Sequence, residues 1–544
     1  MTGGAPAREA DIVIVGGGAA GSVLARRLAE NPALEVLLIE AGPSDAGQPG
    51  IRSAGTWNEL IGSRFDWQQS YAATSHTAGR EIGIPRGRVL GGSSSINAML
   101  WYRGHASDYD EWEAAGATGW NFETLLPFFR KSEDWQGGET DFRGAGGPMK
   151  VRTSTAPHAV AQAMLDGAAE LGLPVIDDAN AADNEGATLS NLNVTIEDDG
   201  TMTRWSTVRG YLDPASGWPN LTILTDATVT ALTFEGDRCV GVEYRAVSDG
   251  NATVRVRARQ GVVLAAGALI TPRLLMLAGI GEPSELVPLG IRMRVALPGV
   301  GKNLQDHPLL MGVNFRARGE LGATRDNGGG SMLNWKSSKA RGKPDLHAFV
   351  VQGPHATDEV RATHDFTGAA GGTGAAGKGS VFAIAPGLMH SRSVGYLRLR
   401  TADPFAGVHS ALELQPNYLA EPDDLEALIE SLDVVRELAA TSAYGELGAD
   451  PVSPARGLSR AEKIAFVRSS VSTFFHTCGT AAMGTGPGAV VDPELRVYGV
   501  DGLWVADASV FPVIPTSNTQ APVIAVAERA ATLIAASLAA VASR

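Results

Sequence analysis

Two short segments near the end of the chain carry the side chains best suited to acid–base chemistry. The first, FFHTCGTAAMG, contains His476, and the second, PTSNTQAP, contains Asn518 and Gln520. An imidazole has an ordinary pKa of about 6.5, so His476 could accept a proton near neutral pH. An amide does not titrate, but it can hold a substrate oxygen by hydrogen bonding. Together these residues predict a site that removes a proton from an oriented, oxygen-bearing substrate.

Simpler interpretations of the same segments stay open at this point. A lone histidine such as His476 is often a hydrogen-bonded core residue, and Cys478 is more typical of a small buried side chain than of a nucleophile. The His476-Thr-Cys478 spacing does not suit a metal ion, so no metal site is predicted. Phe474 and Phe475 fit a substrate pocket and an aromatic core equally well. His307, earlier in the chain, is interpreted as a residue that ties down a turn.

Residues 11–40, DIVIVGGGAAGSVLARRLAENPALEVLLIE, predict the element that must position a ligand for this chemistry. The β-branched run at 11–15 is typical of a buried parallel strand, and Ala19–Ala29 follow as a helix. The turn between them has the G-x-G-x-x-G spacing of a dinucleotide-binding unit, with glycines at Gly16, Gly18 and Gly21.

Each glycine of this turn has its own task. The first permits the turn, the second lets a pyrophosphate approach the backbone at the helix N-terminus, and the third lets the helix lie against the strand. The second strand, Glu35–Ile39, ends at Glu40, which lies 19 residues after Gly21. A separation of about 20 is usual for the acid that binds the ribose. The unit predicts a bound dinucleotide, and the motif alone does not separate FAD from NAD.

Further strand and helix patterns follow. Residues 257–267 predict a second buried strand that turns into a helix, and residues 220–244 alternate as two strands of a meander. A strand ending at Asp507 leads through a proline-rich crossing to a helix that begins near Pro522, because proline is tolerated in the first helical turn. We therefore expect residues 516–520 at the positive end of a helix.

At 544 residues the chain is long enough for two or more domains. Residues 311–469 alternate as strands at 394–401 and 411–414 and then predict a helix at 423–440, which suits an antiparallel substrate-binding domain. Residues 366–380, FTGAAGGTGAAGKGS, contain too few apolar side chains to order themselves. They are interpreted as a mobile surface loop, with an active-site lid as the alternative.

Composition and charge restrict the possible partners. Hydrophobic residues make up 44% and charged residues 19% of the chain, which argues against disorder. The formal net charge of −14 argues against binding to nucleic acid or to an anionic membrane. The apolar tail 521–540 is interrupted by Glu528 and Arg529, so it predicts a buried helix rather than a membrane span. The two cysteines lie too far apart for a disulfide framework, and the first strand begins too early for a signal sequence, so a cytoplasmic protein is expected.

Several motifs in order along the chain resemble those of the glucose-methanol-choline (GMC) oxidoreductases, and the resemblance runs essentially end to end. It is carried by the glycine turn with Glu40, RVLGGSSSIN at 88–97, GALITPRLLMLAGIG at 267–281, PGVGKNLQDH at 298–307, HTCGTAAMG at 476–484, and Asp507 with Asn518. The chain is accordingly identified as a member of this family.

The resemblance implies an α/β fold in which a Rossmann-type FAD-binding domain is interleaved with an α+β substrate domain built on a mostly antiparallel sheet. The FAD-binding domain would comprise residues 1–150, 205–310 and 470–544, and the substrate-binding domain residues 151–204 and 311–469. The implied cofactor is FAD. Some relatives attach it covalently through a histidine that would fall at Ile96 here, so we expect the FAD to be non-covalent.

The resemblance also assigns cofactor-binding residues. They are Gly16, Gly18, Gly21, Glu40, Arg88, Gly91, Gly92, Asn97, Val229, Asp507 and Thr519. Among them, the Gly91-Gly92 pair and Asn97 would let the backbone approach the isoalloxazine ring. Asp507 would lie beside the diphosphate, and Val229 beside the adenine.

The implied activity is oxidation of an alcohol to the aldehyde, and the expected substrate is a primary alcohol, with aryl and furan alcohols as candidates. His476 matches the position of the catalytic base and Asn518 the second active-site position, while Gln520, two residues on, leaves a register ambiguity. Oxygen or another acceptor would then restore the flavin. A non-redox lyase that cleaves hydroxynitriles is the alternative, since some relatives do so on this fold. The particular alcohol, the acceptor and the oligomeric state are not determined by the sequence.

Overall fold

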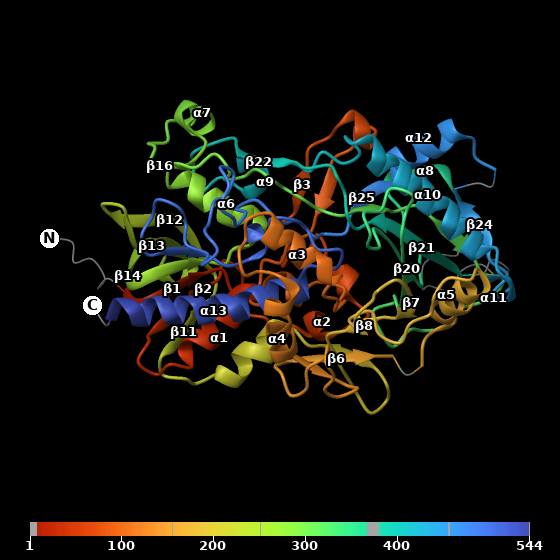
Figure 1. Cartoon of the computed structure of the whole chain (residues 1–544), viewed down its shortest axis with the longest axis horizontal. Helices are drawn as coiled ribbons and strands as arrows, with labels where there is room; N and C mark the ends of the chain where they lie inside the picture. The colour runs from red at the N-terminus through yellow and green to blue at the C-terminus, as the bar shows by residue number, and fades with distance from the viewer. Residues whose placement is uncertain (1–7, 155, 251, 367–379, 455–456, 543–544) are drawn as a thin grey trace.

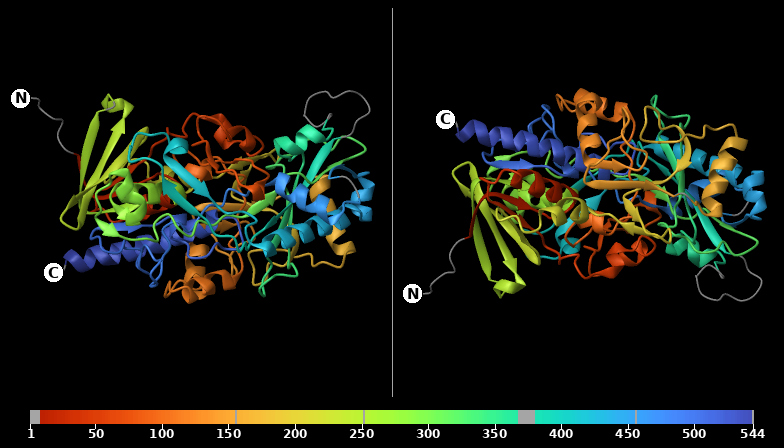
Figure 2. Two further views of the ribbon diagram at one scale, coloured as in Figure 1. Left: turned by 90° about the horizontal axis from the view of Figure 1, so that it is seen from above. Right: turned by 90° about the horizontal axis from the view of Figure 1, so that it is seen from below.

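The computed structural model describes residues 8–154, 156–250, 252–366, 380–454 and 457–542 (Figure 1). Two large sheets lie toward opposite ends of the long axis, and the segments that connect them fill the middle of the molecule (Figure 2). The predicted loop 366–380 falls, apart from its first and last residues, outside the described residues.

The first sheet has seven strands and a parallel centre. Its parallel strands, in spatial order, are β11 (Leu221–Leu224), β2 (Val36–Ile39), β1 (Arg8–Val15), β14 (Thr253–Leu264) and β26 (Leu503–Val505). β12 (Ala227–Glu235) and β13 (Arg238–Ala246) form a hairpin that continues antiparallel from the first half of β14. Every residue of β2 is buried, as expected for a parallel strand covered on both faces.

One helix packs against this sheet, and a second packs on the first. α1 (Ala19–Ala29) follows the glycine turn, and α13 (Gln520–Ala542) lies along it and also contacts α4 (Phe122–Ser132). The α13 carboxylate of Glu528 is fully buried, and it pairs with Arg27 at 2.7 Å and with Lys131 at 2.9 Å. Residues 520–540 are long and apolar enough to cross a membrane by length and composition, and 56% of the most apolar window is buried inside the protein. The apolar tail is thus a core helix, as predicted.

The second sheet has eight strands, and its pairings are antiparallel. Its main path is β24 (Asp450–Ser453), β18 (Asn314–Arg316), β21 (Val381–Leu388), β20 (Leu346–Val351), β19 (Ser331–Trp335) and β7 (Gly186–Leu189). Off this path, β17 (Pro308–Leu310) pairs with β21, and β25 (Val471–Thr473) pairs with β17. Helices α5 (Ala159–Glu170) and α10 (Pro422–Ala439) pack against it.

Alternation along β20 separates its two faces. Leu346, Ala348 and Val350 join the main hydrophobic core, whereas Phe349 and Val351 line a cavity. Successive side chains of a strand point to opposite faces, so one short sequence, LHAFVV, serves both the core and the cavity wall.

Two expectations differ from the structure. Residues 220–244 contain three strands rather than a two-stranded meander, because β11 leaves the hairpin and pairs in parallel with β2. The strands predicted at 394–401 and 411–414 are β22 (Tyr396–Leu399) and β23 (Leu412–Gln415). They pair with each other in a separate ribbon that packs on α6 (Gly267–Leu277) and β3 (Gln69–Tyr71), not in the eight-stranded sheet.

The division into two domains remains a proposal. The strands of each sheet fall mostly within the residue ranges expected for one domain. β17 and β25 are exceptions, since they belong to the second sheet although their residues lie within 205–310 and 470–544.

Candidate active site

A cavity of about 730 Å³ lies at the carboxyl ends of the parallel strands and extends to the second sheet. Most of the predicted site residues meet there although they come from distant parts of the sequence. The cavity is lined by Gly16, Gly18, Glu40, Arg88, Gly92, Asn97, Val229, His476, Asp507, Asn518 and Thr519. Gly21 and Gly91 pack inside the protein instead. A ligand site at this edge is the rule for open α/β sheets.

The glycine turn has the form that a dinucleotide needs. Gly16 has a φ of +101°, and a Cβ there would come within 2.6 Å of the Ala265 carbonyl oxygen. A Cβ at Gly21 would lie 1.8 Å from the Gly16 carbonyl oxygen, so the third glycine lets α1 lie against β1. At Gly18, by contrast, the nearest heavy atom to such a Cβ is 3.9 Å away. Neighbouring protein atoms therefore do not require Gly18, and the open space beside it suits a phosphate at the helix N-terminus.

Two buried carboxylates accept hydrogen bonds from the backbone at this end of the cavity. Glu40 accepts hydrogen bonds from the amides of Gly17 at 2.8 Å and Gly42 at 2.7 Å, and burial raises its pKa to about 7. Asp507 accepts hydrogen bonds from the Gly267 amide at 2.8 Å and the Thr271 hydroxyl at 2.6 Å, which tie it to the start of α6. Each carboxylate thus fixes the backbone that would surround the cofactor.

Gly92 and Asn97 form the wall that faces the start of α13. A Cβ at Gly92 would lie 2.7 Å from the Gly18 Cα, which shows how closely the second glycine cluster approaches the first. Gly91 donates its amide to the Gly17 carbonyl at 2.7 Å, and its own Cβ position faces the Ser95 hydroxyl rather than the cavity. Asn97 donates to the Gln520 side-chain oxygen.

His476 lies where β25 has ended, on the cavity wall. The Asn518 amide nitrogen lies 3.1 Å from Nε2 of His476, and Nδ1 of His476 lies 2.8 Å from Nδ1 of His307. With the amide as donor, Nε2 is unprotonated, and the ring proton sits on Nδ1 and is donated to His307. Asn518 is therefore the amide beside the imidazole, whereas Gln520 contacts Asn97. His307 is more than a turn residue, because it fixes the orientation of the His476 ring.

Burial keeps the histidines of this site uncharged. It lowers the pKa of His476 well below its ordinary value, with the neighbouring His307 and Arg86 adding to the effect. Burial also lowers the pKa of His307 to about 3. Neutral imidazoles are thus present across the ordinary pH range, as a proton acceptor requires.

Asp306 organises the residues behind His476, and sequence reasoning assigned it no role. One of its oxygens accepts hydrogen bonds from the backbone amides of His307 and His476, both at 2.8 Å. The other accepts from three hydroxyl groups, at 2.5 to 2.8 Å, which belong to Tyr71, Tyr418 and Thr473. The only signal for it in the sequence was the PGVGKNLQDH segment that carried the family resemblance.

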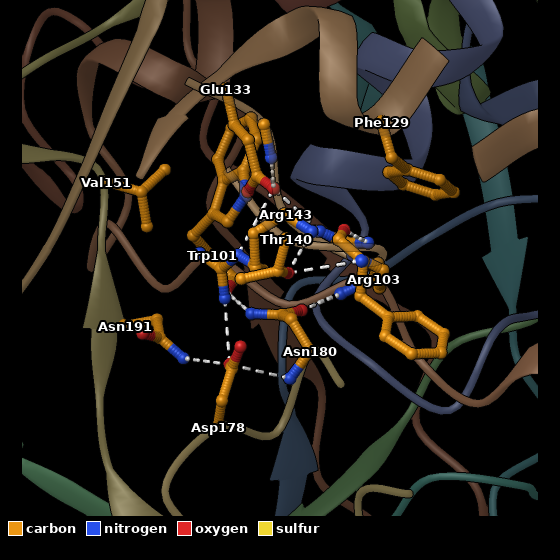
Figure 3. Close-up of polar contacts among 12 residues, drawn as sticks. Trp101, Arg103, Phe129, Glu133, Thr140, Arg143, Val151, Asp178, Asn180 and Asn191 are labelled. Carbon is orange, nitrogen blue, oxygen red and sulfur yellow. Dashed lines mark hydrogen bonds and ion pairs between the residues drawn. The ribbon is translucent and has the colours of Figure 1, made fainter. Parts of the chain in front are cut away.

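A buried ionic network lies next in the chain to one stretch of cavity-lining residues (Figure 3). Glu133 accepts hydrogen bonds from Arg103 at 2.8 Å, Arg143 at 3.1 Å and the Trp101 indole at 3.1 Å (Figure 3). Asn180 donates to the Trp101 carbonyl at 3.0 Å. These contacts anchor the chain directly after the cavity-lining residues 96–100.

Comparison with known proteins decides the family. A family model described as GMC oxidoreductase matches residues 10–309, and a second model, for the C-terminal part of GMC oxidoreductases, matches residues 391–527. The chain belongs to the GMC oxidoreductase family. The family resemblance inferred from the motifs is thereby confirmed, as is the fold class.

The similar proteins span nearly the whole chain. Mitochondrial choline dehydrogenase of Homo sapiens is 35% identical over 97% of this chain and 90% of its own length. Oxygen-dependent choline dehydrogenase of Brucella suis is 35% identical over 96% of this chain and 95% of its own. The crystal structure of pyridoxine 4-oxidase from Mesorbium loti superposes with a TM-score of 0.86 at 34% identity, covering 96% of this chain and 98% of that one. This chain is an FAD-dependent oxidoreductase that acts on CH–OH donors.

Proposed function

We propose that this protein oxidises a primary alcohol to the aldehyde, with His476 as the base and Asn518 as the residue that holds the alcohol oxygen. The observation that carries the proposal is the pairing of an imidazole nitrogen with a side-chain amide nitrogen, 3.1 Å apart, on the wall of a cavity that also contains the glycine turn. Aryl and furan alcohols are the substrates that we expect.

The residues of this chain account for the proton and for the orientation of the substrate. Nε2 of His476 takes the hydroxyl proton, and the Asn518 amide turns from that nitrogen to the developing alkoxide oxygen. The hydrogen bond from Nδ1 to His307 keeps the ring from rotating while Nε2 reacts. Bound FAD supplies the acceptor for the hydride that leaves the carbinol carbon. A positioned base of this kind contributes roughly 10² to 10⁴ in rate.

Anaerobic mixing with a panel of aliphatic, aryl and furan alcohols tests the proposal. We expect loss of the oxidised-flavin absorbance, and His476→Ala should slow it roughly 10²- to 10⁴-fold while FAD stays bound. His409→Ala is the control, because that residue is exposed and its ring nitrogen lies 3.3 Å from the Ser70 hydroxyl, outside the proposed site. If no alcohol reduces the flavin and the enzyme instead cleaves a hydroxynitrile, the result would support the lyase alternative. Parallel assays for hydrogen peroxide and for dye reduction identify the acceptor.

We further propose that FAD is held without a covalent bond. Ile96 occupies the place of the histidine that anchors the flavin in some relatives, and its side chain has no nucleophilic atom. Acid precipitation should therefore release the yellow cofactor into the supernatant. Colour that remains in the pellet would contradict this. The cytoplasmic location likewise remains a proposal, which fractionation of the source cells would test.

A further inference from the structure

The wall of the cavity next to His476 is apolar. Leu309, Ala385, Met389 and Phe474 form one buried cluster, with Phe349 packed against it. Leu309, Phe349 and Phe474 from this cluster line the cavity. An alcohol bound with its hydroxyl at His476 would place its non-reacting end among side chains of this kind.

No carboxylate lies on that wall in the described part of the chain. Among the described residues, the acidic side chains that line any part of the cavity belong to Glu40, Asp226 and Asp507. Each follows a strand of the first sheet, at the cofactor end: Glu40 and Asp507 are tied to the backbone of that end, and Asp226 donates its amide to the Gly42 carbonyl. None faces the second sheet, where the substrate would lie.

The charged side chain that lines the cavity beside His476 is positive. Arg86 lines the cavity and donates to the Thr477 hydroxyl at 2.7 Å. It is close enough to His476 to lower the pKa of that imidazole. Among the described residues Arg86 forms no ion pair. The buried Asp306 carboxylate lies behind His476, but it does not line the cavity, and its oxygens already accept five hydrogen bonds. A cationic substrate at this wall would therefore meet the positive charge of Arg86 rather than a free carboxylate.

Nor is this wall an open aromatic cage for a cation. The Phe474 ring stacks on His476, with 5.5 Å between ring centroids and an interplanar angle of 7°, and its side chain is only 8% exposed. His347 packs edge-on against Phe474 at 5.7 Å. Cages that bind quaternary ammonium groups need several free ring faces around the charge. Here one face of the Phe474 ring is covered by His476, and His347 packs against the same ring.

We propose that this site selects a neutral alcohol with an apolar non-reacting end over a cationic alcohol of the same shape. The inference rests on the proposed function and deepens it by naming the substrate class. Removing an ammonium group from water without a partner carries a large free-energy cost, whereas an isosteric hydrocarbon group gains from the same burial. By this inference choline is a poor substrate here, although the similar choline dehydrogenases are named for it.

Choline and 3,3-dimethyl-1-butanol provide the test, because they have nearly the same shape and differ by one charge. Anaerobic flavin reduction by the holoenzyme is measured with each, and kcat/KM is compared. We expect the neutral alcohol to be preferred by about 100-fold or more. Equal rates or a preference for choline would overturn the inference and leave the proposed function standing. A flavin that no alcohol of any charge reduces would instead overturn the proposed function.

A charge placed on the wall gives an independent test. Leu309→Glu should raise the kcat/KM ratio of choline to 3,3-dimethyl-1-butanol by about tenfold or more, while the isosteric Leu309→Gln should not raise it. Binding of tetramethylammonium, followed by the flavin absorbance spectrum, should strengthen in Leu309→Glu alone. If Leu309→Gln shifts the ratio as much as Leu309→Glu, charge is not the determinant and the proposal fails. If either variant fails to fold, the comparison of choline with 3,3-dimethyl-1-butanol on the wild-type enzyme still tests the proposal.

Discussion

Asp306 connects His476, the proposed base, to the rest of the protein through five hydrogen bonds. Three hydroxyl groups and two backbone amides leave this buried carboxylate fully satisfied. A buried, satisfied carboxylate fixes the groups around it in one arrangement. Since it binds the backbone of His476 rather than the ring, it acts as a positioning residue.

Asp306→Asn should therefore affect turnover more than substrate binding. The amide can still accept at one oxygen, but its nitrogen cannot accept from the three hydroxyl groups, so the His476 segment shifts. We expect kcat to fall about 10- to 100-fold with KM nearly unchanged and FAD retained. Tyr418→Phe, which removes a single donor, should cost less. Loss of thermal stability with an unchanged kcat would mean that the role is only structural.

The turn between β1 and α1 makes a separate prediction about cofactor binding. Gly18 adopts an extended conformation, with φ −72° and ψ −164°, that alanine tolerates, and an added methyl group would meet no protein atom closer than 3.9 Å. The methyl group would instead occupy the space for the pyrophosphate. Gly18→Ala should fold normally and bind FAD at least about tenfold more weakly.

Fluorescence titration of the apoprotein with FAD measures this effect. Gly445→Ala is the matched control, because a Cβ there has no heavy atom within 4 Å and the residue is far from the cavity-lining set. Unchanged FAD affinity in Gly18→Ala would show that the phosphate does not approach this glycine.

Local patterns in the sequence were sufficient to predict the bounds of helices such as the one after the glycine turn. The helix expected at Ala19–Ala29 has those bounds, and the one expected at 423–440 is α10, because periodicity and caps act within a few residues. The partner of a strand is a long-range property, so the pairing of β11 with β2 was missed, and the sequence did not show that β22 and β23 form a ribbon apart from the eight-stranded sheet. The same limit hid Asp306, whose five donors come from segments separated by up to hundreds of residues.

Candidate site residues that belong to a sequence motif were easier to find than residues whose role depends on a contact with a distant residue. The glycine spacing identified the turn that lines the cavity, and the resemblance identified His476 and Asn518. The contact between His476 and His307 could not be predicted, because 169 residues separate them. The pairing of β17 with β25, together with the hydrogen bonds of Asp306, brings their rings together.

Buried histidines link the stability of the whole protein to pH. Burial lowers the pKa of His307 to about 3 and of His347 to about 4, whereas both titrate near 6.5 in an unfolded chain. The stabilisation is fully present above pH 6.5 and is lost as pH falls toward the folded values, because only the unfolded chain takes up these protons. At pH 5 each such histidine should cost about 2 kcal/mol of unfolding free energy.

Urea unfolding of the holoenzyme at pH 7.5 and pH 5 measures this loss. His347→Asn removes one of the buried rings, so the difference between the two pH values should shrink by about 2 kcal/mol in that variant. Carboxylates elsewhere contribute equally to both proteins and cancel in the comparison. An identical pH dependence in the variant would exclude His347 as a source.

The parallel sheet around the glycine turn is completed by the end of the chain. β26 (Leu503–Val505) pairs with β14, and α13 (Gln520–Ala542) lies along α1 and brings Glu528 to Arg27. During synthesis, residues 8–39 therefore lack these two neighbours until residues 503–542 have left the ribosome. We expect FAD to bind only after that point, so a nascent chain stalled before residue 500 should be colourless.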